Sequence, residues 1–156
     1  MCVKYAHPDE VIRAGFFGGT LRGDGPAGGL RGAAVSGYRA RSIDELPTLW
    51  DGFAKLLRPG LGLEAFGANI MDLPPNYETK SHDEAQSGQQ ELYVALRGSG
   101  AVLVGEQRLS LDADHLVCVD AGTARVVASG PDGLRVLCVG GVPGGVYEPP
   151  DWSSAE

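Results

Sequence analysis

Histidine and cysteine, two of the side chains that most often hold metal ions, are scarce in this sequence. The 156 residues include three of each, and no two cysteines stand in C-x-x-C spacing. An odd number of widely spaced cysteines argues against a disulfide framework and against a zinc ribbon. A nucleophile elbow and a Ser/His/Asp spacing are also missing. The sequence therefore carries no standard motif for hydrolysis or for structural zinc.

Long apolar runs and an excess of basic charge are absent too. No stretch approaches the roughly 20 residues needed to span a bilayer, and the first residues lack the apolar segment of a secretory signal. With 20 acidic against 13 basic side chains, the net charge is −7. Such a surface repels phosphate backbones. We therefore expect a cytoplasmic protein whose partners include neither a membrane nor a nucleic acid.

Composition divides the chain into two parts. Residues 1–40 contain nine glycines, carry a net charge of +2 and show almost no periodic apolar pattern. Residues 41–156 carry eight basic and seventeen acidic side chains, a net −9. The first part offers too few apolar groups to offset the entropy lost on ordering. We predict a disordered leader over 1–40, with 1–36 dispensable, and a single folded domain over 41–156.

The beginning of the second part has a helical pattern. Apolar residues recur at i, i+3, i+4 and i+7 over 43–57, which predicts one short amphipathic helix there. Ser42 and Glu45 have the spacing of a capping box, and Pro47 fits the first turn. Such a helix needs a surface on which to bury its apolar stripe.

From residue 61 onward the sequence is typical of antiparallel β structure. Short apolar segments alternate with spacers that carry glycine or aspartate, which predicts a sandwich or a barrel over 61–140. Residues 141–156 contain Pro143, Pro149, Pro150 and Trp152, and we expect them to form an extended tail over the barrel. The predicted strands are 64–73, 78–82, 91–97, 101–105, 107–111, 115–120, 124–129 and 134–140.

Strand parity predicts which side chains face the interior. In 91–97, Glu91, Tyr93 and Ala95 share one face, and we expect that face to point inward. The opposite face of the same strand is also apolar, so a second cover is needed. The helix or a second copy of the chain would supply it, and we expect a homodimer.

Two stretches resemble the sequence motifs of the cupin superfamily, small β-barrels that hold a metal ion or a small molecule. One is Glu91-Leu-Tyr-Val-Ala-Leu-Arg-Gly98, and the other is Val119-Asp-Ala-Gly-Thr-Ala-Arg125. Glu91 and Gly98 match the end of the family's first motif, G(x)5HxH(x)3–4E(x)6G. Gly122 matches the turn glycine of the second, G(x)5PxG(x)2H(x)3N. The resemblance covers 65–140 and implies an all-β, antiparallel double-stranded β-helix, or jelly roll.

The departures from these motifs fall on the metal ligands. The His-x-His pair becomes His82-Asp-Glu84, and the gap to Glu91 is six residues. Arg125 stands where the second motif has its histidine. A guanidinium is protonated at any accessible pH and cannot ligate a cation.

The resemblance leaves a metal site open. His82, Glu84 and Glu91, with Gln86 or water, would bind a divalent ion such as iron, manganese, nickel or zinc. The positive charge of Arg125 beside the ion counts against this interpretation. An exposed loop position for His82 is the plainer alternative.

The metal-free interpretation pairs Arg125 with Glu91, and also with Glu84. In its structural form this is a buried ion pair in a degenerate site. In its functional form Arg125 and His82 receive an anionic ligand, such as a small carboxylate, with Tyr93 beside them.

Three functions follow from these alternatives. The first is binding of a small polar or anionic metabolite in the barrel interior, with catalysis not assured. The second is a divalent-metal-dependent enzyme, a dioxygenase or an isomerase/epimerase acting on a small metabolite. The third is a non-catalytic interaction or regulatory module. The fold alone does not choose among them.

Overall fold

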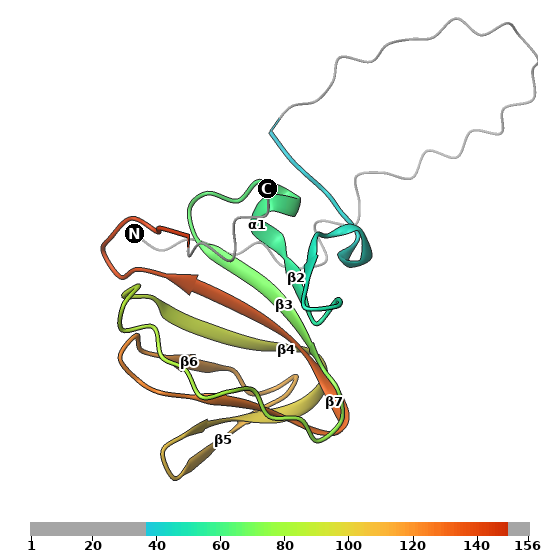
Figure 1. Cartoon of the computed structure of the whole chain (residues 1–156), viewed down its shortest axis with the longest axis vertical. Helices are drawn as coiled ribbons and strands as arrows, with labels where there is room; N and C mark the ends of the chain where they lie inside the picture. The colour runs from blue at the N-terminus through green and yellow to red at the C-terminus, as the bar shows by residue number, and fades with distance from the viewer. Residues whose placement is uncertain (1–36, 150–156) are drawn as a thin grey trace, which may run out of the picture. The chain divides into compact units, whose positions relative to one another are not determined.

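A computed structural model describes residues 37–149 of the chain, and the predicted leader up to residue 36 lies outside the described residues, as do residues 150–156 with Trp152. The described part is mostly antiparallel β structure, as predicted (Figure 1). None of its helices is long and apolar enough to cross a membrane. Its elements are the 3-10 turn η2 (Ile43–Glu45), β1 (Thr48–Leu49), β2 (Ala54–Leu56), α1 (Leu57–Leu61), β3 (Gly67–Leu73), β4 (Gln90–Val104), β5 (Gln107–Leu111), β6 (Val117–Val119) and β7 (Val126–Gly141).

The strands form one antiparallel sheet in the order β1-β2-β3-β7-β4-β5, and β6 also pairs with β4. Two long strands, β4 and β7, dominate it and pair with each other along most of their length. The first half of β4 also pairs with β6, and its second half pairs with β5. Figure 1 shows the sheet curling so that β5 and β6 lie at one end and β2 and β3 at the other.

The turns predicted at 98–100 and 130–133 are wrong. Both segments lie inside long strands, where the β4–β7 register shifts between Gly98 and Gly100. Gly98 has φ +74°, and a Cβ there would collide with the carbonyl oxygen of Gly133. Glycines at these positions let both strands bend and continue, because no side chain keeps the two backbones apart.

The predicted helix over 43–57 is also wrong, although the structure does contain one short α-helix, at Leu57–Leu61. The Ser42–Glu45 capping box forms, but it caps only the 3-10 turn η2. β1 and β2 then form a hairpin whose second strand pairs with β3. The hairpin turn contains Asp51-Gly52, a dipeptide that strongly favours such turns. In this segment a hairpin that pairs with the edge of β3 forms instead of the amphipathic helix that the apolar spacing predicts.

The predicted strand over 78–82 is reduced to two isolated bridges. Glu78 pairs with Ala128, and His82 pairs with Arg125. The remaining predicted strands match observed strands with shifted ends or as parts of β4 and β7. The bridge at His82 matters for the site, because it holds the segment between β3 and β4 against the start of β7.

The predicted inward face of β4 is confirmed. Tyr93 is 1% exposed and belongs to the hydrophobic core, and Ala95 packs against that core. On the opposite face, Leu96 is exposed. The other core members come from β3 to β7 and the residues between them: Leu73, Val102, Leu111, Val117, Val119, Val127, Leu134, Val136 and Cys138.

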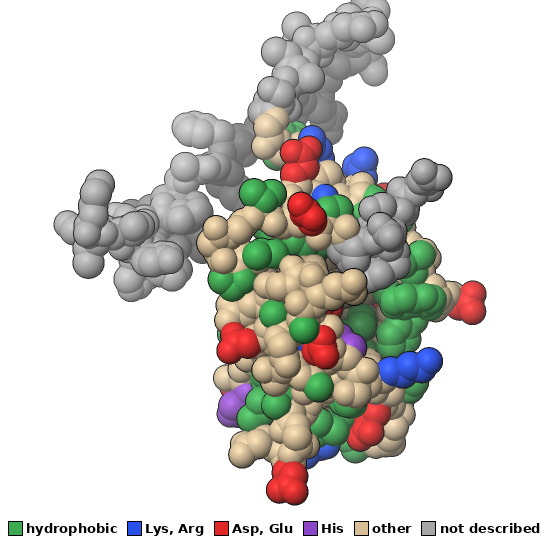
Figure 2. All heavy atoms as spheres, turned by 60° about the vertical axis from the view of Figure 1, so that its left-hand side comes forward, with side chains coloured by type: hydrophobic (Ala, Val, Ile, Leu, Met, Phe, Trp, Pro, Cys, Tyr) green, Lys and Arg blue, Asp and Glu red, His purple; other side chains and the backbone are tan. Residues whose placement is uncertain are grey.

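The described part of the predicted tail follows β7 without forming another strand. Its Tyr147 is buried, lies against Gly67 and receives the guanidinium of Arg58 at 5.2 Å from the ring centroid. On the surface, acidic side chains are scattered among apolar ones on the face that Figure 2 shows, and basic side chains are few. This distribution agrees with the net −9 of residues 41–156.

Candidate functional site

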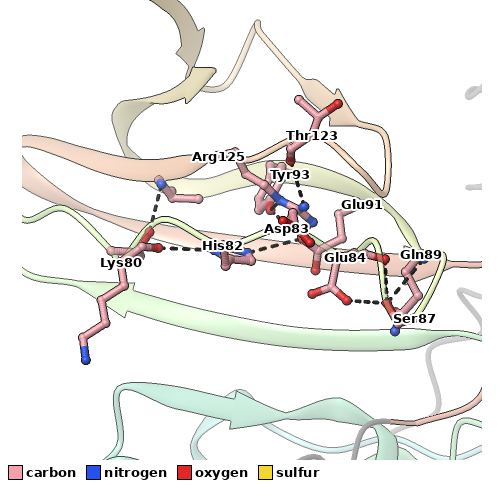
Figure 3. A network of polar contacts seen from close by, with 12 residues as sticks. Lys80, His82, Asp83, Glu84, Ser87, Gln89, Glu91, Tyr93, Thr123 and Arg125 are labelled. Carbon is pink, nitrogen blue, oxygen red and sulfur yellow. Dashed lines mark hydrogen bonds and ion pairs between the residues drawn. The ribbon is translucent and has the colours of Figure 1, made fainter. Parts of the chain in front are cut away.

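Three parts of the chain bring the predicted site residues together (Figure 3). Glu91 and Tyr93 stand two residues apart on β4, so both side chains point to the interior. Arg125 lies just before β7. The backbone of His82 exchanges two hydrogen bonds with that of Arg125, at 3.1 and 2.9 Å between nitrogen and oxygen. Backbone pairing therefore fixes where the histidine stands.

One oxygen of Glu91 is the centre of the arrangement. Its Oε2 accepts hydrogen bonds from the Tyr93 hydroxyl at 2.5 Å and from Nη2 of Arg125 at 2.5 Å. Nε2 of His82 lies 3.8 Å from the same oxygen. The Glu91 side chain is 14% exposed, so this oxygen is largely shielded from water. Charge-assisted hydrogen bonds of this kind are roughly twice as strong as neutral ones.

The ion pair predicted between Arg125 and Glu91 is confirmed. The Arg125 side chain is 0% exposed. Its Nε donates to the Tyr93 hydroxyl at 3.0 Å, and its Nη1 donates to the carbonyl oxygen of Thr123 at 3.1 Å. All three guanidinium nitrogens therefore bond within the protein. The Arg125 guanidinium is therefore buried and contacts Glu91 and Tyr93 directly.

The acidities of these groups follow from burial and hydrogen bonding. Burial alone raises the pKa of Glu91, but the nearby His82 and the hydrogen bonds from Tyr93 and Arg125 outweigh it, and its pKa falls from 4.5 to about 2. Burial and the neighbouring carboxylate raise the pKa of Tyr93. Burial lowers the pKa of Arg125, yet its bonds to Tyr93 and Glu91 raise it overall. The pair is charged and the phenol is neutral at neutral pH.

His82 and Glu84 are less enclosed. The Glu91 carboxylate raises the pKa of His82, whose side chain is 40% exposed and whose Nδ1 lies 3.3 Å from the carbonyl oxygen of Lys80. Oε2 of Glu84 accepts a hydrogen bond from the hydroxyl of Ser87 at 2.5 Å. The partner that the structure gives Glu84 is thus Ser87 and not Arg125.

The donors predicted for a metal ion do converge. One ligand atom from each of His82, Glu84 and Glu91 lies within 4.8 Å of the others. One imidazole and two carboxylates suit several divalent ions, so the donor set fits. Against it, Glu91 already accepts two hydrogen bonds on Oε2, one of them from the Arg125 cation. Gln86, the predicted fourth donor, is exposed and does not line the cavity.

A cavity of about 770 Å³ opens beside this cluster. His82, Glu84, Glu91 and Tyr93 line it, whereas Arg125 does not. A neighbouring space of about 30 Å³ behind Asn69 is too small for a metabolite. The remaining walls of the larger cavity consist of Trp50, Phe53, Ala54, Asn69, Met71, Tyr77, Thr79, Lys80, Asp83 and Cys138.

Sequence reasoning missed the aromatic wall of this cavity. Trp50 and Phe53 lie in the β1–β2 hairpin, in the segment for which the apolar spacing predicts a helix. Asn69 and Met71 stand two residues apart on β3 and share one face of the strand, which strand parity indicates. Tyr77 belongs to the segment before the His82 bridge, where no regular pattern points inward.

The comparisons with known proteins identify the fold. No protein-family model and no curated protein matches the sequence. Among solved structures, a cupin protein from Bacteroides fragilis matches with a TM-score of 0.59 and 18% identity, covering 78% of this chain and 98% of that one. A protein with a double-stranded β-helix domain from Klebsiella pneumoniae matches with a TM-score of 0.52 and 19% identity, covering 69% and 87%.

A third match, the cupin domain of an XRE family transcriptional regulator from Enterobacter cloacae, has a TM-score of 0.50 and 15% identity, covering 58% of this chain and 95% of that one. The architecture thus defines an antiparallel barrel of the double-stranded β-helix type. The chain has the cupin fold, as the motif resemblance implied. At these identities the likeness carries the fold and no particular activity.

The buried pair makes a quantitative prediction. Arg125→Ala should lower the free energy of unfolding by about 3–5 kcal/mol, because it leaves the Glu91 carboxylate without its cation. Arg125→Ala combined with Glu91→Ala should cost less than the sum of the two single changes. Urea unfolding of the four proteins measures this coupling. Arg135→Ala, which breaks a more exposed pair with Asp72, is the control and should cost about 1 kcal/mol. Strictly additive single effects would contradict the pairing.

The low pKa of Glu91 predicts that the free energy of unfolding depends on pH. Its pKa is about 2 in the folded protein against 4.5 for an unperturbed glutamate. The carboxylate therefore stabilises the fold fully above pH 4.5, and this contribution disappears as the pH falls through 2. Its size is about 3 kcal/mol. The free energy of unfolding should fall more steeply from pH 5 to 2 in the wild type than in Glu91→Gln. Parallel pH profiles would show that Glu91 titrates normally.

Proposed function

We propose that this protein binds a small polar molecule in the barrel cavity. The observation that carries the proposal is the cavity of about 770 Å³, whose lining combines aromatic side chains with a cluster of polar ones. Binding sites for small molecules have volumes of roughly 300–1,000 Å³ and combine apolar walls with a few convergent polar groups. His82, Glu84, Glu91 and Tyr93 are the proposed polar contacts.

The geometry favours a polar ligand over an anionic one. An anionic ligand would need the donors of Arg125, and those donors are directed to Glu91, Tyr93 and the backbone of Thr123. Apart from His82, the charged side chains on the cavity wall are Lys80 and three carboxylates. Such a wall repels a free anion, so the anionic form of the hypothesis has little support.

A metal-dependent enzyme is the second candidate function, because three donors converge within 4.8 Å. His82, Glu84 and Glu91 would hold a divalent ion, which would supply Lewis-acid polarisation of a bound substrate. In that case Arg125 and Tyr93 would keep Glu91 ionised and correctly oriented. The guanidinium beside Glu91 would also weaken the affinity for a 2+ ion.

We also propose that the chain forms a homodimer. Leu96 on the outer face of β4 and Leu116 next to β6 are exposed large apolar side chains. Burying them against a second copy would remove apolar surface from water.

A regulatory role without catalysis, the third alternative, agrees equally well with the ligand-binding proposal.

If ligands bind in the cavity, a bulky side chain added to its wall should abolish binding. A screen of small polar metabolites by ligand-observed NMR should give binders of the wild type. Met71→Trp adds a large ring to the cavity wall and should abolish their binding. Glu106→Trp places the same ring at an exposed turn outside the cavity and should leave binding unchanged. No binder at all, or binders that ignore Met71→Trp, would refute the proposal.

Arg125 predicts weak metal affinity. Wild-type protein purified without chelators or affinity metals should contain less than one metal ion per chain by elemental analysis. Arg125→His replaces the cation with a possible ligand and should bind Zn²⁺ at least about tenfold more tightly. Arg108→His, an exposed position on β5, controls for an added surface histidine. Stoichiometric metal in the wild type, lost in Glu91→Gln, would make the metal enzyme the better candidate.

A further inference from the structure

We propose that the ligand of this cavity is a protonated amine attached to an apolar body, with its ammonium group at Glu84 and Glu91 and its body against Trp50, Phe53 and Tyr77. The inference rests on the proposed function and names the class of ligand. Three features of the cavity carry it: carboxylate acceptors, a surplus of negative charge, and aromatic side chains in the same lining.

Acceptors outnumber donors on the polar side of the cavity. Oε2 of Glu91 and Oε2 of Glu84 each have donors from the protein, and the second oxygen of each carboxylate remains available for a ligand. Asn69 also lines the cavity, but its side-chain oxygen is buried, so the acceptors offered to a ligand are the carboxylate oxygens. An ammonium group has three donors and no acceptor, which matches this set.

The charge of the wall points the same way. The Arg125 cation is buried behind Glu91 and offsets that one carboxylate. The negative charges of Glu84 and Asp83 are not offset in this way. Lys80 is the one lysine among the lining residues, and it is exposed. Figure 3 shows the ammonium end of Lys80 directed away from Glu84 and Glu91. A cationic group placed between the two glutamates would therefore be attracted by them, and His82 beside Glu91 would oppose it only when protonated.

An aromatic wall completes the cavity. The Phe53 and Tyr77 rings lie 5.6 Å apart between centroids, at 60° to each other. Trp50 lines the same space and is 61% exposed, so its ring stands at the opening. Aromatic rings attract cations and also pack against the apolar part of a ligand. A carboxylate cluster alone would attract the cation but would not bind the apolar part.

The hairpin turn fixes the backbone at Trp50. Trp50 has φ +52° and Asp51 has φ +54°, both in the left-handed region. For a residue as bulky as tryptophan this is an outlier, which costs free energy unless the surroundings hold it. The turn between β1 and β2 therefore determines where this lining residue stands.

Three matched probes test the inference on the full 156-residue chain in the presence of EDTA. They are 2-phenylethylamine, 2-phenylethanol and phenylacetate, which share an apolar body and differ in charge. Isothermal titration should show the amine binding at least about tenfold more tightly than the alcohol, because a charge-assisted hydrogen bond is worth more than a neutral one. Phenylacetate should not bind.

Variants assign the contacts. Glu84→Gln should weaken the amine about tenfold and leave the alcohol unchanged, because only the ammonium uses the charge. Trp50→Leu should weaken both, since both share the apolar body. Glu106→Gln removes a carboxylate from the exposed turn between β4 and β5 and should change neither.

The remaining outcomes overturn the inference. Equal affinity for amine and alcohol, preference for phenylacetate, or binding of none of the three would each do so. Preference for phenylacetate only when Mn²⁺ replaces EDTA would favour the metal enzyme. The proposed function is judged separately, by the metabolite screen with Met71→Trp: binders found there without a preference for amines would leave it standing while this inference falls.

Discussion

The buried guanidinium of Arg125 is the constraint on which the rest of the site depends. A charge without access to water needs a partner, and Glu91, Tyr93 and the Thr123 carbonyl together satisfy all three nitrogens. These partners come from β4 and from the segment before β7, so the ion pair ties together the two strands that dominate the sheet. The interior of the barrel is thus organised around a pair of opposite charges.

The bends in β4 and β7 make this pair possible. Because both strands continue through their glycine-containing bulges, their first and second halves lie in different parts of the curled sheet. Tyr93 in the first half of β4 then shares a core with Val102 in its second half and Val127 in β7. Had the glycines ended the strands, as the sequence pattern suggested, the interior would have had no continuous wall between the polar site and the core.

The sequence predicted the fold and the central contact, and it missed the aromatic wall. Glu91 and Arg125 were paired from their motif positions, because motif spacing reports which residues converge across a barrel. Trp50 and Phe53 were assigned to a helix, since apolar spacing within one segment cannot reveal that a neighbouring strand, β3, offers an edge to pair with. Parity places Asn69 and Met71 on one face of β3, but the sequence does not show that this face borders a cavity.

The position of the cation decides what kind of ligand the cavity suits. A positive charge on the cavity wall would attract anions, and the motif alone allowed that outcome. In the structure the guanidinium is buried against Glu91, where it keeps the carboxylate ionised and bonds to only one of its two oxygens. The same residue that stands in the place of a metal-binding histidine therefore preserves the acceptor side of the site. A fold of this kind can therefore present different chemistry through the side chains that line its cavity.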